Sequence, residues 1–219
     1  MENKKNTLCV GKLIKVRPEY EERYVIIHKH VWPEVLERIY KSNIRNYSIF
    51  MLDGILFSFN EYVGNNYEDD MNTVGDSVTR DWWKLTDPMQ EPLSTIIAGE
   101  WWADAEQIQH FDEIQKDYSS IKRKAYTAEI KPESESLVKN HFKELDNSLY
   151  RLFNQSNIQN HTSFLRDNNL YIYFEYYGSD FQKDDKALNS DTELSKWNSE
   201  LENYLNVSWK EMLEVFHTN

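Results

Sequence analysis

The chain has 219 residues, of which 40% are hydrophobic, and a formal net charge of −12. This charge argues against DNA or RNA as a partner, because the phosphate backbone would repel it. No apolar run approaches the roughly 20 residues of a membrane helix, Met1–Asn6 lacks the apolar core of a signal peptide, and Cys9 is the single cysteine. A reducing compartment, and thus a cytoplasmic protein with no membrane partner, is expected.

The first half of the chain alternates strand and helix patterns. Apolar residues at spacings of three and four predict a helix over 19–40, interrupted at Trp32-Pro33 because proline fits best in a helix's first turn. Asp53-Gly54 between two alternating runs predicts a hairpin over 46–62. A strand at 9–16, a second helix at 71–85 and a last strand at 95–102 complete the order β-α-β-β-α-β.

The second half follows the same order. It is predicted to contain a strand at 123–130, a helix at 133–154, a hairpin at 160–177, a helix at 193–204 and a last strand at 209–216. Asn168 takes the place of Gly54 at the turn, which is acceptable because asparagine tolerates positive φ. The polar stretch 103–120 is expected to be a helical linker.

A repeat of 114 residues connects the two halves. Shifted by this amount the sequence matches itself without a gap: Ser42-Asn43-Ile44 meets Ser156-Asn157-Ile158, and Glu61-Tyr62 meets Glu175-Tyr176. A period of this size indicates two domain-sized units. We expect a repeat at 1–104, a linker at 105–121 and a second repeat at 122–219.

The element order predicts an α+β protein of two ferredoxin-like βαββαβ repeats. A four-stranded sheet with both helices on one face leaves its other face to be buried. We therefore expect the repeats to pack sheet to sheet as an intrachain pseudo-dimer of the dimeric α/β-barrel type.

The residues that the repeats do not share all lie in the first copy and suggest a site. His28 faces Phe142, Tyr24 faces Val138, and Trp82 faces Lys196, whereas Trp83 recurs as Trp197. These residue types suit proton transfer on a small neutral polyol: histidine exchanges protons near neutral pH, tyrosine donates hydroxyl hydrogen bonds, and indole faces stack on a pyranose. The competing interpretation is ordinary core packing, which accounts for most buried aromatic residues.

A metal or cofactor is not expected. The sequence contains no clustered His, Cys and Asp set with metal-ligand spacing and no glycine-rich phosphate loop. The presence of only six glycines in the whole chain argues against a glycine-rich nucleotide-binding loop.

The combined pattern resembles the L-rhamnose mutarotase family. It consists of Tyr24, His28 and Trp32-Pro33-Glu34, followed by Asn46-Tyr47-Ser48-Ile49-Phe50, Trp82-Trp83-Lys84 and Thr86-Asp87-Pro88-Met89. The resemblance runs from about residue 9 to residue 104, and Leu213–His217 resembles the family's terminal strand. It implies an isomerase of carbohydrate metabolism that interconverts the α and β anomers of a 6-deoxy-L-sugar.

The resemblance also implies roles for individual residues. His28 stands at the position of the family's catalytic proton donor. Our own hypothesis is that His28 handles the ring-oxygen or anomeric proton and that Tyr24 orients it or serves as its partner. Tyr24, Tyr47, Trp82 and Trp83 stand at its sugar-binding positions. Ring opening requires a proton on the ring oxygen and the loss of one from the anomeric hydroxyl, after which the open aldehyde rotates and recloses on the other face.

Family members are single repeats that pair by exchanging strands between subunits. The second repeat would then be a structural partner with one site per chain, so the protein is expected to be a monomer through its internal pseudo-dimer or a homodimer of it. L-Rhamnose and the epimeric L-fucose both stay open as the monosaccharide substrate.

Three alternatives stay open. The same fold is used by small monooxygenases, some of which use haem, and a non-catalytic sugar-binding module would carry the same aromatic residues. A separate ligand site in the second repeat could be built from Tyr171, Tyr173, Tyr176 and His161, although tyrosines packed between sheets are the simpler interpretation.

Overall fold

The computed structural model describes residues 7–111, 121–145 and 147–219. The segment Met1–Asn6 and most of the expected linker, residues 112–120, lie outside the described residues. The chain divides into two compact units, one up to Ala105 together with Leu213–Asn219, and one from Glu106 to Met212.

The N-terminal unit follows the βαββαβ order. Its elements are β1 (Leu8–Val16), η1 (Pro18–Tyr20), α1 (Glu21–His28), α2 (Pro33–Lys41), β2 (Ile44–Leu52), β3 (Ile55–Tyr62), α3 (Tyr67–Val74), α4 (Ser77–Thr86), η2 (Asp87–Met89), β4 (Gln90–Glu91) and the beginning of β5 (Ala103–Phe111). Strand β3 lies between β1 and β2. Strand β1 pairs on its other side with β4 and Ala103–Ala105, and β2 pairs with Leu213–Thr218.

The C-terminal unit repeats this arrangement. Its elements are β6 (Lys122–Ile130), η4 (Pro132–Ser134), α5 (Glu135–Lys143), α6 (Asn147–Gln155), β7 (Ile158–Arg166), β8 (Asn169–Tyr176), α7 (Phe181–Leu188), α8 (Thr192–Glu202) and β9 (Leu205–Thr218). Strand β8 lies between β6 and β7. The residues of β9 up to Met212 pair with β6, and Glu106–Phe111 of β5 pair with β7.

The predicted helix break and turns are confirmed. Pro33 is the first residue of α2, after a non-helical Trp32. Asp53 and Gly54 have φ of 49° and 75°, and Asp167 and Asn168 have φ of 50° and 60°. These left-handed pairs form the type of turn that joins strands with the native twist.

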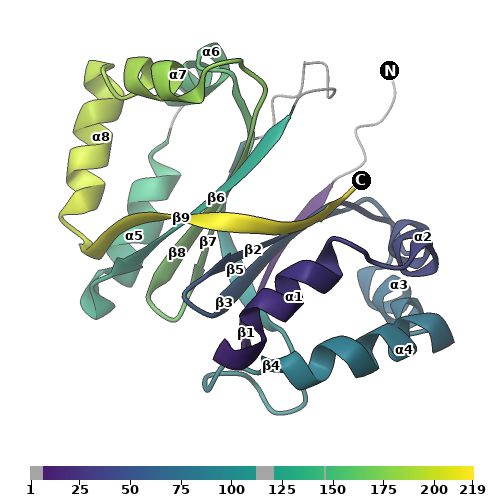
Figure 1. The fold of residues 1–219 in the computed structure, drawn as a ribbon. Coiled ribbons are helices and arrows are strands. Elements are labelled where there is room, and N and C mark those ends of the chain that lie inside the picture. The colour runs from purple at the N-terminus through teal and green to yellow at the C-terminus, as the bar shows by residue number, and fades with distance from the viewer. Residues whose placement is uncertain (1–6, 112–120, 146) are drawn as a thin grey trace. The chain divides into compact units, whose positions relative to one another are not determined.

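Helix and strand contacts define a core in each unit. Figure 1 shows the helices of each unit on one face of that unit's strands. In the N-terminal unit Ile14, Tyr24, Ile49 and Leu56 belong to one buried cluster, and Val35, Ile39, Ile44 and Trp82 form another. The C-terminal unit contains a larger cluster that includes Val138, Phe142, Leu170 and Tyr176.

Two sequence predictions at the end of the first repeat are wrong. Residues 95–102 are not a strand, and 103–111 form β5 rather than a helical linker. The cause is a difference in length between the repeats. The residues that pair with the edge of β1, Gln90 and Ala103, are thirteen positions apart. The residues that pair with the corresponding positions of β6, Leu205 and Lys210, are only five positions apart. The 114-residue shift therefore fails after β4, and the first repeat carries an additional loop, Pro92–Trp102.

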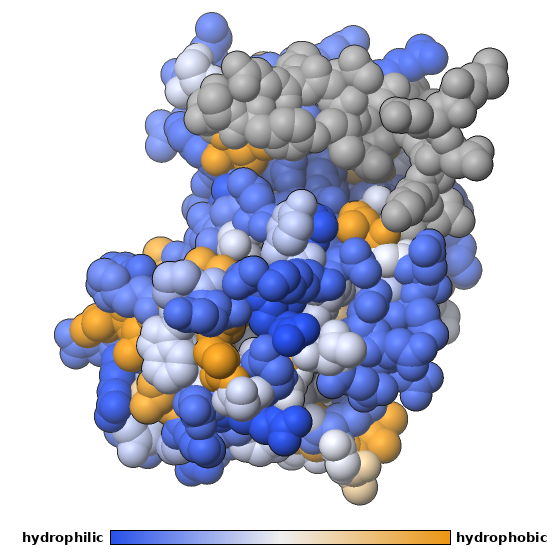
Figure 2. Space-filling view, turned by 90° about the vertical axis from the view of Figure 1, so that its right-hand side faces the viewer, coloured by the Kyte–Doolittle hydropathy of each residue, from blue (hydrophilic) through white to orange (hydrophobic). Residues whose placement is uncertain are grey.

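The surface agrees with a composition in which 40% of the residues are hydrophobic. The face seen in Figure 2 is mainly hydrophilic, with small scattered groups of hydrophobic residues. None of the helices in the described part of the chain is long and apolar enough to cross a membrane.

Candidate active site in the N-terminal unit

Helix α1 positions the first two candidate residues. Tyr24 and His28 are one helical turn apart and therefore lie on the same face. Both are buried, with exposed fractions of 0% and 8%. Their rings stack with centroids 3.9 Å apart and an interplanar angle of 27°, whereas His30, beyond the end of α1, is exposed.

The surroundings of His28 determine its protonation. Nδ1 of its imidazole lies 2.9 Å from the backbone oxygen of Tyr24. A carbonyl oxygen only accepts, so Nδ1 carries the proton and Nε2 keeps its lone pair. Burial lowers the pKa of His28 to about 4, against the opposing effect of this hydrogen bond. The side chain is therefore a neutral proton acceptor at pH 7.

The hydroxyl of Tyr24 remains protonated and can donate. Burial raises the pKa of Tyr24 well above its ordinary value, and the nearby Tyr47 adds to this effect. Gln90 donates to its hydroxyl oxygen through Nε2 at 3.3 Å, and Trp101 holds Gln90 by donating to Oε1 at 3.2 Å. Because Gln90 is a donor in this pair, the Tyr24 proton is left for another acceptor.

A β-bulge positions Tyr47. The pairing of β2 with β3 slips between Arg45 and Ser48, and Asn46 within the slip has a φ of 48°. Asparagine tolerates this left-handed conformation, and its side-chain amide donates to Glu61 Oε1 at 2.8 Å. Bulges redirect the side chains beside them, and Tyr47 follows directly.

Phe216 connects Tyr47 to the histidine. It comes from the end of β9, and its ring centroid lies 5.5 Å from that of Tyr47 and 6.0 Å from that of His28, both edge to face. Burial and the neighbouring Tyr67 raise the pKa of Tyr47. The phenol is thus protonated and, like Tyr24, a hydrogen-bond donor.

The two tryptophans of α4 have different surroundings. Trp82 is buried and its ring lies edge to face with His28 at 5.6 Å and with Trp32 at 5.5 Å. Trp83 is 39% exposed. A Cβ on Gly75 would meet the Trp83 ring at 3.2 Å, so the indole lies against this glycine. Adjacent helix positions point about 100° apart, which explains the difference.

The structure thus brings four of the five predicted residues into one aromatic cluster, Tyr24, His28, Tyr47 and Trp82, while Trp83 lies beside it on α4. Sequence reasoning missed Gln90, Trp101 and Phe216. The repeat could have indicated Gln90, because Tyr204 stands at its shifted position. Phe216 stands opposite Trp102 at the same shift, but it is distant in sequence from the residues it contacts.

The cluster offers acid–base groups and hydrogen-bond donors. Within residues 7–111, 121–145 and 147–219, no group of three or more His, Cys, Asp and Glu side chains is arranged to hold a metal ion. The side chains themselves provide a neutral imidazole, two protonated phenols and an indole. This set can move a proton on a neutral, hydroxylated ring without forming a covalent bond to it.

Three comparisons with known proteins extend this description. The family model described as L-rhamnose mutarotase matches residues 9–111 and again residues 123–218. An L-rhamnose mutarotase of Oceanobacillus iheyensis is 28% identical over 94 residues, which are 40% of this chain and 89% of that protein. Another, from Tolumonas auensis, is 32% identical over 72 residues, 32% of this chain and 68% of that protein.

Solved structures show the fold. A protein assigned as a monooxygenase from Lactobacillus acidophilus superimposes with a TM-score of 0.60 at 9% sequence identity, over 96% of each chain. At this identity the likeness concerns the fold alone. The two curated relatives, in contrast, share sequence with this chain over most of their own length.

Proposed function

Since the chain belongs to the L-rhamnose mutarotase family, with both repeats matched, we propose that its N-terminal unit interconverts the α and β anomers of a 6-deoxy-L-sugar. L-Rhamnose is the first candidate, because both curated relatives carry that name. L-Fucose is the second candidate. The observation that carries the proposal is the neutral His28 imidazole in contact with Tyr24 and Trp82.

The catalytic step follows from the protonation of these groups. With its lone pair on Nε2, His28 takes the proton of the anomeric hydroxyl, while the Tyr24 hydroxyl donates to the ring oxygen. The bond between C1 and the ring oxygen breaks and leaves an open aldehyde. Rotation about C1–C2 exposes the other face and the ring closes, as His28 returns its proton to the anomeric oxygen and Tyr24 recovers its proton from the hydroxyl that becomes the ring oxygen.

Binding follows from the surrounding side chains. Trp82 supplies an apolar surface for the C–H face of the pyranose, and the Tyr47 hydroxyl donates to a sugar oxygen. Trp83 is proposed as a further sugar-binding residue, supported by the family resemblance and by its accessible indole. Gln90 and Trp101 position Tyr24 through their hydrogen bonds.

We also propose the packing of the repeats, the oligomeric state and the cellular location on the basis of the family resemblance. The two repeats pack their sheets together within one chain, as single-repeat members of the family do between subunits, and the protein is either a monomer or a homodimer of this pseudo-dimer. A cytoplasmic location is supported by Cys9, which is buried and is the single cysteine of the sequence.

Saturation-difference NMR on L-rhamnose, L-fucose and a control D-hexose tests the function. The protein should accelerate anomer exchange of one or both deoxy sugars above the spontaneous rate and leave the D-hexose unchanged. Saturable binding without faster exchange would instead establish a sugar-binding module. A Soret band after the addition of haem would favour the monooxygenase alternative, which rests on likeness of fold alone.

A further inference from the structure

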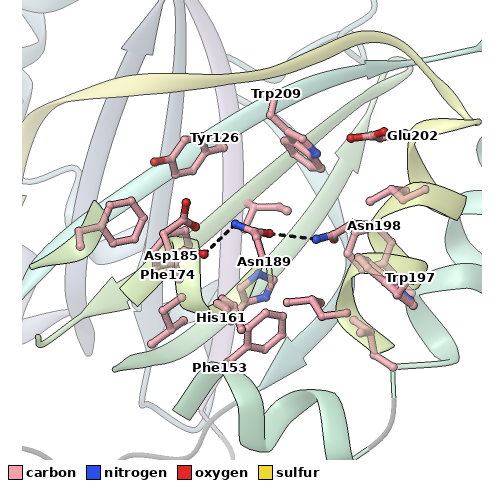
Figure 3. A pocket seen from close by; sticks show the side chains of 18 residues that line it. Tyr126, Phe153, His161, Phe174, Asp185, Asn189, Trp197, Asn198, Glu202 and Trp209 are labelled. Atoms are coloured by element: carbon pink, nitrogen blue, oxygen red, sulfur yellow. Dashed lines mark hydrogen bonds between the residues drawn. The ribbon is translucent and has the colours of Figure 1, made fainter. Parts of the chain in front are cut away.

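The C-terminal unit contains a cavity of about 350 Å³ between its sheet and its helices (Figure 3). Most of its wall is aromatic or aliphatic and comes from α5–α8 and the helix-facing side of the strands. The rings that line it belong to Tyr126, Phe142, Phe153, Phe174, Phe181, Trp197 and Trp209. Every lining residue belongs to the C-terminal unit.

This cavity occupies the place in the second repeat that the candidate active site occupies in the first. At the 114-residue shift, the lining residues Phe142, His161 and Trp197 correspond to His28, Tyr47 and Trp83. His161 follows a bulge at Asn160, whose φ is 49°, just as Tyr47 follows Asn46. The site position is therefore retained, but a phenyl ring replaces the catalytic imidazole.

We propose that the C-terminal unit binds a neutral aromatic small molecule that carries a hydroxyl or amine hydrogen-bond donor, and does so without catalysis. The polar groups on the wall, the shape of the cavity and its charge each contribute to this assignment. The inference is independent of the sugar chemistry proposed for the N-terminal unit.

His161 provides a buried acceptor. Its ring is 7% exposed and lies parallel to Phe153 at 4.9 Å and to Phe174 at 6.1 Å between centroids. Nδ1 lies 3.1 Å from Gln109 Oε1. Since an amide oxygen only accepts, Nδ1 carries the proton and Nε2 is the acceptor. Burial, together with nearby His110, lowers the pKa of His161 to about 4, so the ring is neutral at pH 7.

The other polar side chains also favour a donor. Figure 3 shows Asn189 between Asp185 and Asn198. Asn189 donates to the Asp185 backbone oxygen at 2.9 Å and accepts from Asn198 at 3.2 Å, so these amides are already engaged. The carboxylates of Asp185 and Glu202 also line the cavity. They are acceptors when ionised, and burial raises the pKa of Asp185.

Charge argues against an anionic ligand. None of the described side chains lining the cavity is a lysine or arginine. The ammonium of Lys124 lies 4.5 Å from the centroid of the Phe181 ring, but it pairs with Glu211. A carboxylate or phosphate ester would thus meet Asp185 and Glu202 without a free cation.

Size and wall composition define the rest of the ligand. Natural small-molecule pockets have roughly 300–1,000 Å³, and an engineered apolar cavity of about 150 Å³ accepts benzene. The volume of about 350 Å³ therefore suits a ligand of about two rings. The near-parallel rings of Phe153, His161 and Phe174 favour a flat molecule, which would stack on them in offset or edge-to-face geometry.

The probe for this test is 2-naphthol, titrated by isothermal calorimetry into the whole chain. Two matched probes accompany it: 2-methoxynaphthalene, which lacks the donor, and 2-naphthoate, which is anionic. We expect saturable binding of 2-naphthol, roughly tenfold weaker binding of the methyl ether, as for the loss of one buried hydrogen bond, and no binding of the carboxylate.

Variants identify the cavity. His161→Phe should abolish the difference between 2-naphthol and its methyl ether, and Leu188→Trp should weaken both at least tenfold by filling the space. Ile172→Phe, on β8, provides a second filling variant if Leu188→Trp does not fold. His28→Gln is the matched control in the other unit and should retain naphthol binding.

The proposal is overturned if 2-naphthol does not bind at millimolar concentration. It is equally overturned if binding survives the filling variants, or if the methyl ether binds as tightly as the phenol. Naphthol binding that His28→Gln removes would assign the probe to the N-terminal unit and would also contradict the proposal.

Discussion

The two units have the same hairpins and the same side-chain hydrogen bonds beside them, but they differ in the side chains at the corresponding site. The hairpins β2–β3 and β7–β8 have the same bounds after a shift of 114 residues. Asp70 accepts hydrogen bonds from Tyr62 and Asn43, and Asp184 accepts them from Tyr176 and Asn157. This comparison separates the residues that maintain the fold from those available for chemistry.

The glycine after each hairpin illustrates what the fold demands. A Cβ at Gly64 would lie 2.2 Å from the Tyr62 hydroxyl oxygen, and one at Gly178 would lie 2.3 Å from that of Tyr176. Both positions therefore require glycine because the tyrosine hydroxyl lies too close for a Cβ, and not because the backbone conformation demands it. By contrast, His28 and Trp82 become Phe142 and Lys196 without loss of the surrounding helices, so the fold does not require them.

The largest effect outside His28 is expected at Tyr24. Tyr24→Phe removes the proposed acid while keeping the ring that stacks on His28, and it should reduce catalysed L-rhamnose exchange by about 10²-fold. Tyr173→Phe is the matched control, because Tyr173 is a fully buried tyrosine of the C-terminal unit with a hydroxyl bonded to Glu175. Equal rates in both variants would contradict the role assigned to Tyr24.

The pH dependence of exchange should distinguish a neutral imidazole from a protonated one. Because the pKa of His28 is lowered to about 4, its basic form predominates above that value. The catalysed rate should be flat from about pH 5 to 8 and fall as the pH drops through about 4. Saturation-transfer NMR over this range measures it, and a rate that rises on acidification would favour an imidazolium as the active form.

Stability should depend on pH through both units. Burial lowers the pKa of His28 and that of His161 from 6.5 to about 4. The unfolded chain then binds more protons between these values, so the free energy of unfolding falls as the pH drops from about 6.5 to 4, by up to about 3 kcal/mol per histidine. Urea titrations should show a smaller pH dependence for His161→Phe, and an unchanged slope would argue against this titration.

Phe216 tests whether the end of β9 contributes to the N-terminal site. Phe216→Leu retains most of the apolar volume but removes the ring that contacts His28 and Tyr47. We expect a three- to tenfold loss in kcat/KM, roughly 0.7–1.4 kcal/mol, with little change in thermal midpoint. The equivalent change at Phe142 in the C-terminal unit, Phe142→Leu, should leave exchange unaffected.

The smallest expected effects concern the two bulges. Asn46→Ala and Asn160→Ala each place alanine at a φ near 49°, which should cost about 1 kcal/mol of stability in either unit. Only Asn46→Ala should also slow exchange, because Tyr47 follows that bulge. Thermal unfolding and exchange rates measured on both variants test this, and equal rates would contradict it.

Much of the fold could be predicted from the sequence because turn chemistry and periodicity are local. Asp53-Gly54, Pro33 and the alternation of the hairpin strands each determine nearby backbone geometry. The loop Pro92–Trp102 could not be predicted from the repeat. The 114-residue shift matches the two repeats up to β4, but beyond β4 the repeats differ in length and the shift no longer aligns corresponding residues. The 114-residue shift places Glu100 opposite Glu214, yet Glu100 lies in this loop while Glu214 lies in β9.

The site was predictable where its residues lie on one helix or were not shared between repeats. Tyr24 and His28 are one turn apart on α1, and Trp82 differs from Lys196. Gln90, Trp101 and Phe216 are joined to them by tertiary contacts between distant segments, for which a single sequence offers no local signal. The pairing of the two sheets and the roles of the repeats stay predictions.

The most direct test compares one histidine from each unit. The anomer-exchange rate of L-rhamnose is measured by saturation-transfer NMR for the unmodified chain, for His28→Gln and for His161→Gln, with circular dichroism to verify folding. The proposed function predicts that His28→Gln lowers the catalysed rate by about 10²–10⁴-fold, down to the spontaneous rate, while His161→Gln retains it. Undiminished exchange in folded His28→Gln would contradict the assignment of the reaction to the N-terminal imidazole.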